Sequence, residues 1–582
     1  MACRPVPQFP EYAAKKKALA GIIRFRQELF LKVVLALVIC GCNRGTSTSE
    51  PTTTHSSPRS PGASAGDAEV TAPSASLETI LPTDSISAEQ NSGKPGKRFV
   101  VPSETIATPQ ELRLDDDRPA LNRSSMLNSG ITVTDSPHLI LCTDTNIASN
   151  SQLHQFAGQL FDHLEKEVGP LNRSRNGSVF QTTGFLIQAR ERFEEAGVMP
   201  DPNFTIQHGR HLGYQFWMFD PESEYYRRHL LLHEFIHCYM MCEHGNRNIP
   251  PLWFTEGIAE YWATHSVTAT PSGPIAQFGV LPDSIVDFEG WGRISEIRRS
   301  FEGTVIHGVG FQPVQHDQLL SDQVSCERRE LNESAEKVVD AGFVPLRTVL
   351  YPKTPRFQDD WQYAHAWALC WMLSHHPDYA DRFSRLRRIR EGSAFEAMFE
   401  MEFRPLLDTM AIEWLLTLDS LIEGFDMTRS FPRRSIVQTV QHQNPQSLDA
   451  GELATVKVRA DRGWQFTGLT IGEGEQFRID ASGQFTLGME ELPLVSEAAG
   501  ITLEYYRGRP VGELQAILVS TDGSLASRRF AIGCSGSIQL PFRAELWLQL
   551  NEPESMRADN SGSVNVRIRS SGNSPAANTH PQ

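Results

Sequence analysis

A short stretch near the middle of the chain carries side chains that could bind a metal ion. His233, Glu234 and His237 follow the order His-Glu-x-x-His within residues 225–243, an apolar stretch compatible with a helix. Residues four apart lie on one face of a helix, so both imidazoles can reach one ion. Glu234 can address a water molecule on that ion. The pattern therefore predicts metal-assisted hydrolysis.

A second predicted helix could supply the third ligand. After a gap of eighteen residues from His237 comes Glu256, within residues 251–261, a segment that begins with the proline favoured at helix starts. A catalytic zinc site takes three protein ligands and leaves the fourth position to water. His233, His237 and Glu256 thus form a candidate Zn²⁺ set. Glu260, one turn beyond Glu256, can accept the free N–H of a ligand histidine and fix its tautomer.

These residues resemble the gluzincin metallopeptidases, namely the aminopeptidase-N branch and its peptidase MA-like relatives. The resemblance covers about residues 137–425 and rests on residues 233–261. It implies a zinc-dependent peptidase acting on protein or peptide, with His233, His237 and Glu256 as ligands and Glu234 as general base. The Gly-x-Met-Glu-Asn motif of the aminopeptidases is absent before the zinc helix. Its absence favours an endopeptidase or another amidase.

The expected mechanism also requires a donor to the oxyanion. Tyr363 and His365, within a later predicted helix, are the candidates, and for Tyr363 the alternative is a packed aromatic side chain. An intact ligand set could also serve a structural zinc or an inactive enzyme. Cys238 and Cys242 could form a softer site with His244. Structural zinc sites usually take cysteine pairs two to four residues apart from a turn, whereas these two lie on the predicted helix, which favours buried structural cysteines.

The surrounding pattern predicts an α+β, mostly helical, zincin-like domain over residues 137–428. Strands are expected at 138–142, 185–187 and 213–219, and helices at 151–168 and across 376–425. The strand at 213–219 could be an edge strand that aligns a peptide or a plain core strand.

After Arg434 the pattern changes to short strands separated by Gly or Pro, which predicts an all-β sandwich over 435–570. Residues 474–483, 512–514, 546–552 and 559–566 resemble the PA-I-like galactose-binding lectins, and the match covers about residues 448–570. The resemblance implies Ca²⁺ held by Glu552, Asp559 and Asn560, and a carbohydrate ligand. Glu552 replaces an aspartate of that family and Met556 a threonine, and Asp-Asn-Ser-Gly could equally be a turn.

The N-terminal region is predicted to direct export. Residues 1–42 combine a basic segment with a short apolar run and resemble a bacterial lipoprotein signal, which implies lipidation of Cys42. Residues 43–130, rich in Ser, Thr and Pro, are expected to form a disordered linker, as is the tail at 571–582. The chain would then be exported to the cell envelope and anchored to a membrane.

Charge excludes one class of partner. The 582 residues include 54 Lys and Arg against 70 Asp and Glu, for a net charge of −16, which argues against nucleic-acid binding. The sequence thus predicts an exported zinc peptidase with a lectin-like accessory domain. The alternative is a cell-surface carbohydrate-binding protein whose peptidase domain is inactive.

Overall fold

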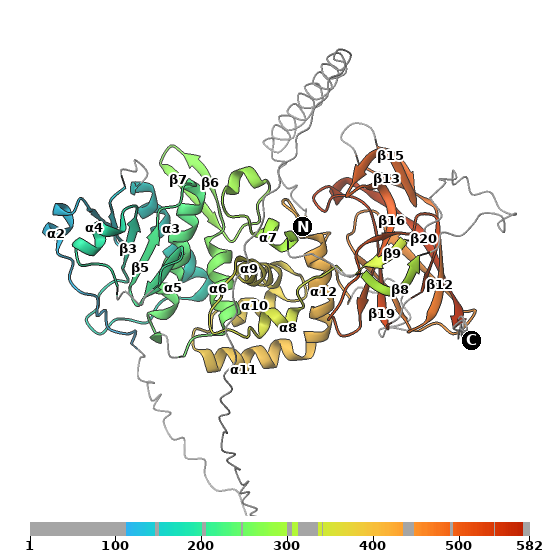
Figure 1. The fold of residues 1–582 in the computed structure, drawn as a ribbon, viewed down its shortest axis with the longest axis horizontal. Coiled ribbons are helices and arrows are strands. Elements are labelled where there is room, and N and C mark those ends of the chain that lie inside the picture. Colours follow the sequence, from blue (N-terminus) through green and yellow to red (C-terminus); the bar gives the residue numbers. More distant parts are fainter. Residues whose placement is uncertain are drawn as a thin grey trace, which may run out of the picture. The chain divides into compact units, whose positions relative to one another are not determined.

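The computed structural model describes residues 112–573, except 146–149, 201–204, 246–247, 300–304, 312–335, 340, 435–446, 489–492 and 540–541. The predicted signal, Cys42, the linker as far as residue 111 and the tail from residue 574 lie outside the described residues. The described part combines helices with several β-sheets, and its C-terminal region is mostly β (Figure 1).

The first sheet has five strands in the order β1-β2-β3-β5-β4. Strands β2, β3 and β5 are parallel to one another, and β1 and β4 pair antiparallel at the two edges. The bounds are β1 Thr132–Asp135, β2 Leu139–Thr143, β3 Thr182–Ile187, β4 Gly209–Leu212 and β5 Gln215–Phe219. The predicted strand at 213–219 corresponds to β5. It is not the edge strand, because β4 pairs along its outer side.

Helix α5 (Glu224–Met241) carries the His-Glu-x-x-His residues beside this sheet. It begins where the Ser223 side chain accepts a hydrogen bond from the Tyr226 N–H, and this N-cap satisfies one of the free amides of the first turn. Helix α5 contacts α3 (Asn150–Val168), strands β3, β4 and β5, and helix α6 (Leu252–Ala263) (Figure 1). The sheet edge and two helices therefore surround the motif.

Helix α6 packs most closely on α9 (Asp360–His375). Gly257 makes this approach possible, because a Cβ at that position would lie 2.4 Å from the Ala366 carbonyl oxygen. The glycine thus brings Glu256 beside the helix that carries Tyr363.

The rest of the helical region completes the core around these helices. Its elements are α2 Arg123–Asn128, α4 Arg190–Glu195, a 3-10 turn Ile285–Phe288, α7 Arg293–Arg299, α8 Leu346–Leu350, α10 Ala380–Leu386, α11 Gly392–Phe403, a 3-10 turn Arg404–Leu406 and α12 Leu407–Ser420. An antiparallel hairpin of β6 (His265–Thr270) and β7 (Gly273–Phe278) accompanies them. Strand β8 (Val305–Phe311) pairs antiparallel with β9 (Glu336–Val339) and contacts β18 (Ser535–Gln539) of the C-terminal region (Figure 1).

The C-terminal strands form two sheets that enclose a separate apolar core. One sheet has the order β14-β13-β20-β12-β18, with β10 also paired to β20, and the other has the order β11-β19-β16-β15, with β17 paired to β16. The bounds are β10 Leu453–Arg459, β11 Gln465–Ile471, β12 Glu475–Ser482, β13 Gln484–Leu487, β14 Leu494–Glu497, β15 Ala499–Tyr506, β16 Arg509–Ser520, β17 Phe530–Ala531, β18 Ser535–Gln539, β19 Ala544–Leu550 and β20 Ser561–Asn573, with a 3-10 turn at Arg557–Asp559. The observed strands match the expected all-β character.

The second sheet of the sandwich also packs on the helical region. Strand β16 turns Leu514, Ala516 and Leu518 toward the sandwich core, whereas Ile517 and Val519 belong to the same apolar cluster as helix α12. Alternation along the strand explains how one strand serves both cores. The described residues accordingly belong to one compact unit.

The expected linker extended to residue 130, but its last residues are ordered. Helix α2 lies there, and Met126 is fully buried against Phe185 and Trp217 in a small apolar cluster. The single buried methionine supplies apolar contacts that polar composition alone did not reveal.

Candidate metal centre

Three side chains from α5 and α6 converge on one point. The Nε2 atoms of His233 and His237 lie 3.0 Å apart. The Oε2 atom of Glu256 lies 3.2 Å from Nε2 of His237 and 3.5 Å from Nε2 of His233. The i,i+4 spacing places both rings on one face of α5. The predicted ligand set is therefore brought together, with ring nitrogens and a carboxylate oxygen as the donor atoms.

These separations fit a small tetrahedral ion. With bonds of about 2.0–2.1 Å to nitrogen and oxygen, the ligand atoms of a tetrahedral zinc ion stand about 3.3 Å apart. The three observed distances bracket that value. Buried imidazoles and a carboxylate with facing donor atoms also form the kind of donor set that zinc accepts.

Charges reinforce the cluster. Burial acts to raise the pKa of Glu256, but the rings of His237 and His233 hold it well below its usual range. Burial acts to lower the pKa of His233, yet hydrogen bonding to Glu256 and the charges of Glu260 and Glu234 raise it overall. The two imidazoles thus face carboxylates, an arrangement that favours a positive charge between them.

Glu260 lies on the far side of the His233 ring from Glu256 and faces its other ring nitrogen. Its Oε1 atom lies 3.4 Å from Nδ1 of His233, and its Oε2 atom lies 3.1 Å from Nε2 of His229. Arg293 of α7 donates to both oxygens, at 2.9 and 3.0 Å. Glu260 thus occupies the position expected for it. His229, one turn before His233, was detectable from its spacing, whereas no sequence signal identified Arg293.

Glu234 and His237 share a neighbour, His211. It is 4 % exposed, and its Oε2 atom lies 3.2 Å from Nδ1 of His211 on β4. The ring of His211 stacks on that of His237, with centroids 4.4 Å apart. Sequence reasoning missed His211, because twenty-one residues separate it from the motif and no local pattern connects them.

The two candidate oxyanion donors have different surroundings, although both lie on α9. The Tyr363 ring lies 6.5 Å from the His233 ring, and the Arg293 guanidinium lies over it at 5.8 Å. His365 is fully buried beside Trp361 and Trp414, and its Nδ1–H donates to the Trp361 carbonyl at 2.7 Å. Burial lowers the pKa of His365 to about 4. Of the two, Tyr363 is the one whose ring lies beside His233, a candidate ligand.

The thiols of Cys238, on α5, and Cys242, the residue after it, face backbone carbonyls. The thiol of Cys238 faces the Gln215 carbonyl at 3.7 Å, and that of Cys242 donates to the Tyr239 carbonyl at 3.1 Å. Burial raises the pKa of Cys242 to about 12, so the thiol keeps its proton. Both cysteines are buried, as the structural alternative expected.

The three residues expected to hold calcium occupy the loop after β19. Asn560 donates to Glu552 and to the Ala460 carbonyl, and its side-chain oxygen accepts the Gly488 N–H at 3.0 Å. Asp559 is exposed nearby. The buried guanidinium of Arg557 donates to the Glu552 carbonyl at 2.9 Å. These side chains thus hydrogen-bond within the loop and also link it to Ala460 and Gly488.

A third group of possible ligands comprises His376, Asp378 and Glu413. Both ring nitrogens of His376 are occupied, one by the Pro432 carbonyl at 2.9 Å and the other by the Asp378 N–H at 3.2 Å. Tyr379 and the Arg434 N–H donate to Glu413. These contacts are those of a packed polar cluster.

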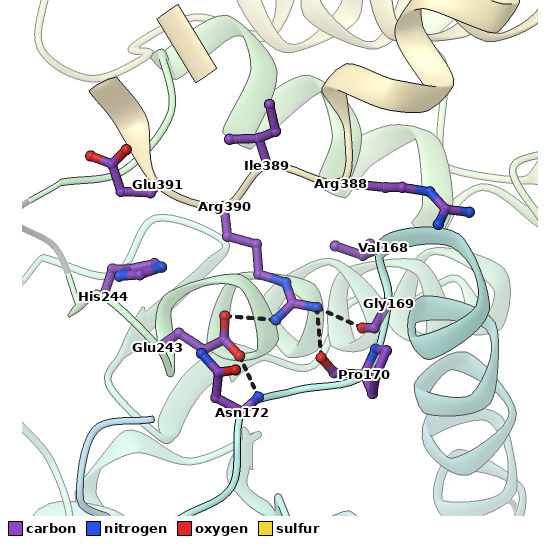
Figure 2. Close-up of a pocket in the computed structure, with 10 residues that line it drawn as sticks. All are labelled: Val168, Gly169, Pro170, Asn172, Glu243, His244, Arg388, Ile389, Arg390 and Glu391. Carbon is purple, nitrogen blue, oxygen red and sulfur yellow. Dashed lines mark hydrogen bonds and ion pairs between the residues drawn. The ribbon is translucent and has the colours of Figure 1, made fainter. Parts of the chain in front are cut away.

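An open groove of about 520 Å³ lies elsewhere, between the loop after α3 and the segment before α11. Figure 2 shows Arg390 extending across it to Glu243 and to the carbonyls of Gly169 and Pro170. Its lining residues do not include the metal-ligand candidates. Arg390 thus links the segment before α11 to the loop after α3.

Comparison with known proteins reveals only weak likeness. No protein family matches the chain, and no curated protein does. The EclA N-terminal domain, a PllA-like lectin, is 23% identical with a TM-score of 0.16, over 20% of this chain and 97% of that one. The IMPa metallopeptidase from Pseudomonas aeruginosa is 12% identical with a TM-score of 0.12, over 21% of this chain and 13% of that one. The chain thus spans a small fraction of the metallopeptidase, and TM-scores this low carry no conclusion about activity.

Proposed function

We propose that this chain is a zinc-dependent peptidase of the gluzincin type. The proposal is carried by the convergence of His233, His237 and Glu256, whose facing nitrogen and oxygen atoms lie 3.0–3.5 Å apart. The buried carboxylate of Glu234 follows His233 on the same helix. A structural zinc site closes all its positions with protein ligands, whereas three ligands and an adjacent acid suit hydrolysis.

Each residue of the proposed site has a separate role in the hydrolysis. When bound, a zinc ion supplies the positive charge that lowers the pKa of water toward about 7 and polarises a carbonyl. Glu234 accepts the proton of the attacking water and returns it to the leaving amine. The Tyr363 hydroxyl donates a hydrogen bond to the developing oxyanion. Burial and the carboxylates of Glu256, Glu260 and Glu234 raise the pKa of Tyr363, so its proton is retained at neutral pH.

The edge of the first sheet favours an extended peptide as substrate. Strand β4 is an edge strand, and its residue His211 contacts Glu234. A peptide that added to this edge would pass the proposed base with its backbone amides paired. The absence of the aminopeptidase motif favours cleavage within the peptide.

The N-terminal region and the β-sandwich would determine where the enzyme acts. We infer export through residues 1–42 and anchoring through Cys42. Among the described residues, no helix is long and apolar enough to cross a membrane. The β-sandwich would target the enzyme, with carbohydrate as the ligand class.

The deciding experiment replaces the proposed base and leaves the ligands intact. Purified wild type is expected to contain one zinc per chain and to cleave a quenched fluorescent peptide mixture. Glu234→Gln should keep the zinc and lose at least about 100-fold in turnover, because general acid–base catalysis contributes that much. The control is Glu224→Gln, an exposed acid in the first turn of the same helix.

Two results would contradict the proposal. Full turnover in Glu234→Gln would exclude the proposed mechanism. Wild type without zinc or cleavage would favour the alternative, a carbohydrate-binding protein with an inactive peptidase domain.

A further inference from the structure

Strand β4 turns two residues toward the proposed base. Gly209 and His211 are two positions apart, so their side-chain positions share one face of the strand. Antiparallel pairing with β5 fixes this register, with Gly209 opposite Met218 and His211 opposite Phe216. Both residues of that face meet Glu234.

Gly209 leaves the space that the carboxylate occupies. A Cβ at this position would lie 2.5 Å from Oε1 of Glu234 and 3.0 Å from its Cγ. Gly209 itself is held in register by its pairing with Met218 of β5. Any side chain larger than hydrogen would therefore displace Glu234.

His211 orients the carboxylate on its other oxygen. Its Nδ1 atom lies 3.2 Å from Oε2 of Glu234, within hydrogen-bond distance of a donor to a carboxylate. The ring cannot turn freely, because it stacks on His237 at 4.4 Å between centroids. One face of the imidazole is thus held by a proposed metal ligand while its edge holds the proposed base.

We propose that His211 is a positioning residue for Glu234, with Gly209 shaping the space beside it. This inference rests on the proposed function, because it assigns a role in the same hydrolysis. A carboxylate that accepts a proton must stay within reach of the water, and a misplacement of 1 Å can cost about 100-fold in rate. Glu234 lies on a helix, but its carboxylate is oriented by a strand that precedes the helix in the chain.

Two substitutions at His211 separate the hydrogen bond from the stacking. His211→Phe keeps an aromatic ring against His237 and removes the donor. His211→Asn places an amide N–H near the Nδ1 position and removes the ring. Three quantities are measured for each variant: bound zinc, kcat and KM on the quenched fluorescent peptide mixture, and the Glu234 carboxylate position in a crystal structure.

We expect His211→Phe to lose about 10- to 100-fold in kcat with KM within threefold and zinc content unchanged. Its crystal structure should show the carboxylate displaced. His211→Asn should retain kcat within about fivefold of wild type, with the carboxylate in place. Equal losses in the two variants, or no loss in His211→Phe, would overturn the positioning role.

A second pair of variants tests the space beside the carboxylate. Gly209→Ala should lower kcat as His211→Phe does, while Gly158→Ala is the control, because a Cβ on Gly158 meets nothing within 4 Å. Unchanged kcat in Gly209→Ala would contradict the role of Gly209. Wild type lacking both zinc and turnover would overturn the proposed function and this inference together, whereas an active wild type with insensitive His211 variants would overturn only the inference.

Discussion

Arg293 places two donor nitrogens on the two carboxylate oxygens of Glu260, at 2.9 and 3.0 Å, inside the protein. The pair joins α7 to α6, one turn from the third ligand candidate. Burial acts to lower the pKa of Arg293, but Glu260 raises it above its usual range, so the guanidinium stays charged. The paired carboxylate in turn faces His229 and His233.

Removing this arginine should destabilise the protein strongly. Arg293→Met would leave a buried carboxylate without its main partner, at a cost of about 3–5 kcal/mol. Urea unfolding of the metal-free protein measures this loss. Arg299→Met is the control on the same helix, because Arg299 forms an exposed pair with Glu296 and should change stability by less than about 1 kcal/mol. Similar values for the two variants would contradict the structural importance of the buried pair.

Metal removal should lower stability only when the ligand set is intact. Binding to the folded state alone adds about 2.7 kcal/mol at a hundredfold excess over Kd. A chelator should therefore lower the Tm of wild type measured by differential scanning fluorimetry, and added zinc should restore it. His237→Ala lacks one ligand, and we expect its Tm to be insensitive to both. A response of the same size in wild type and His237→Ala would place the bound metal elsewhere.

Glu413 should make stability depend on pH. Burial raises its pKa from 4.5 to about 8, and hydrogen bonds from Tyr379 and the Arg434 N–H offset only part of that rise. The folded state therefore holds a proton that the unfolded state releases above about pH 4.5. The contribution of Glu413 to the free energy of unfolding is full below pH 4.5 and is lost as the pH rises to 8, by at most about 1.4 kcal/mol per unit.

Comparison with a variant that lacks a titratable group at position 413 isolates the contribution of Glu413. His376 lies beside Glu413, and burial lowers its pKa to about 4, so its own contribution falls as the medium becomes acidic. Urea unfolding of wild type and Glu413→Gln at a series of pH values cancels that background. The difference between the two proteins should change steadily between pH 4.5 and 8, and a constant difference would show that Glu413 does not titrate there.

The buried salt bridge between α12 and the sandwich should contribute strongly to the free energy of unfolding. Arg529 donates to both oxygens of Asp419, at 3.0 and 2.8 Å, and the Trp464 indole donates to the same carboxylate at 2.8 Å. Asp419→Asn removes one buried charge and should cost about 3–5 kcal/mol. Asp461→Asn, in a more exposed pair with Arg459, is the control and should cost less than about 1 kcal/mol. Tryptophan fluorescence during urea unfolding reports both, and equal losses would contradict a special role for Asp419.

Local features of the site follow from the sequence alone. The four-residue spacing of His233 and His237 implies one helix face, and the later acid at Glu256, on a second predicted helix, indicates the third ligand. The same holds for the alternating strands of the C-terminal region, because period-two patterns reflect a local backbone geometry. Short-range periodicity is sufficient for such inferences, since the helix or strand itself fixes the relative direction of its side chains.

The partners that orient these residues were decided by tertiary structure. His211 reaches Glu234 because β4 pairs antiparallel with β5 at the sheet edge, and Arg293 reaches Glu260 because α7 packs against α9 beside it. Only glycine fits at position 257, because the backbone of α9 passes there. Each of these contacts joins segments distant in the chain, and no local periodicity encodes which strand edge or helix face will meet. The sequence therefore determined which residues could hold a metal, and the packing of the strands and helices determined what holds those residues in place.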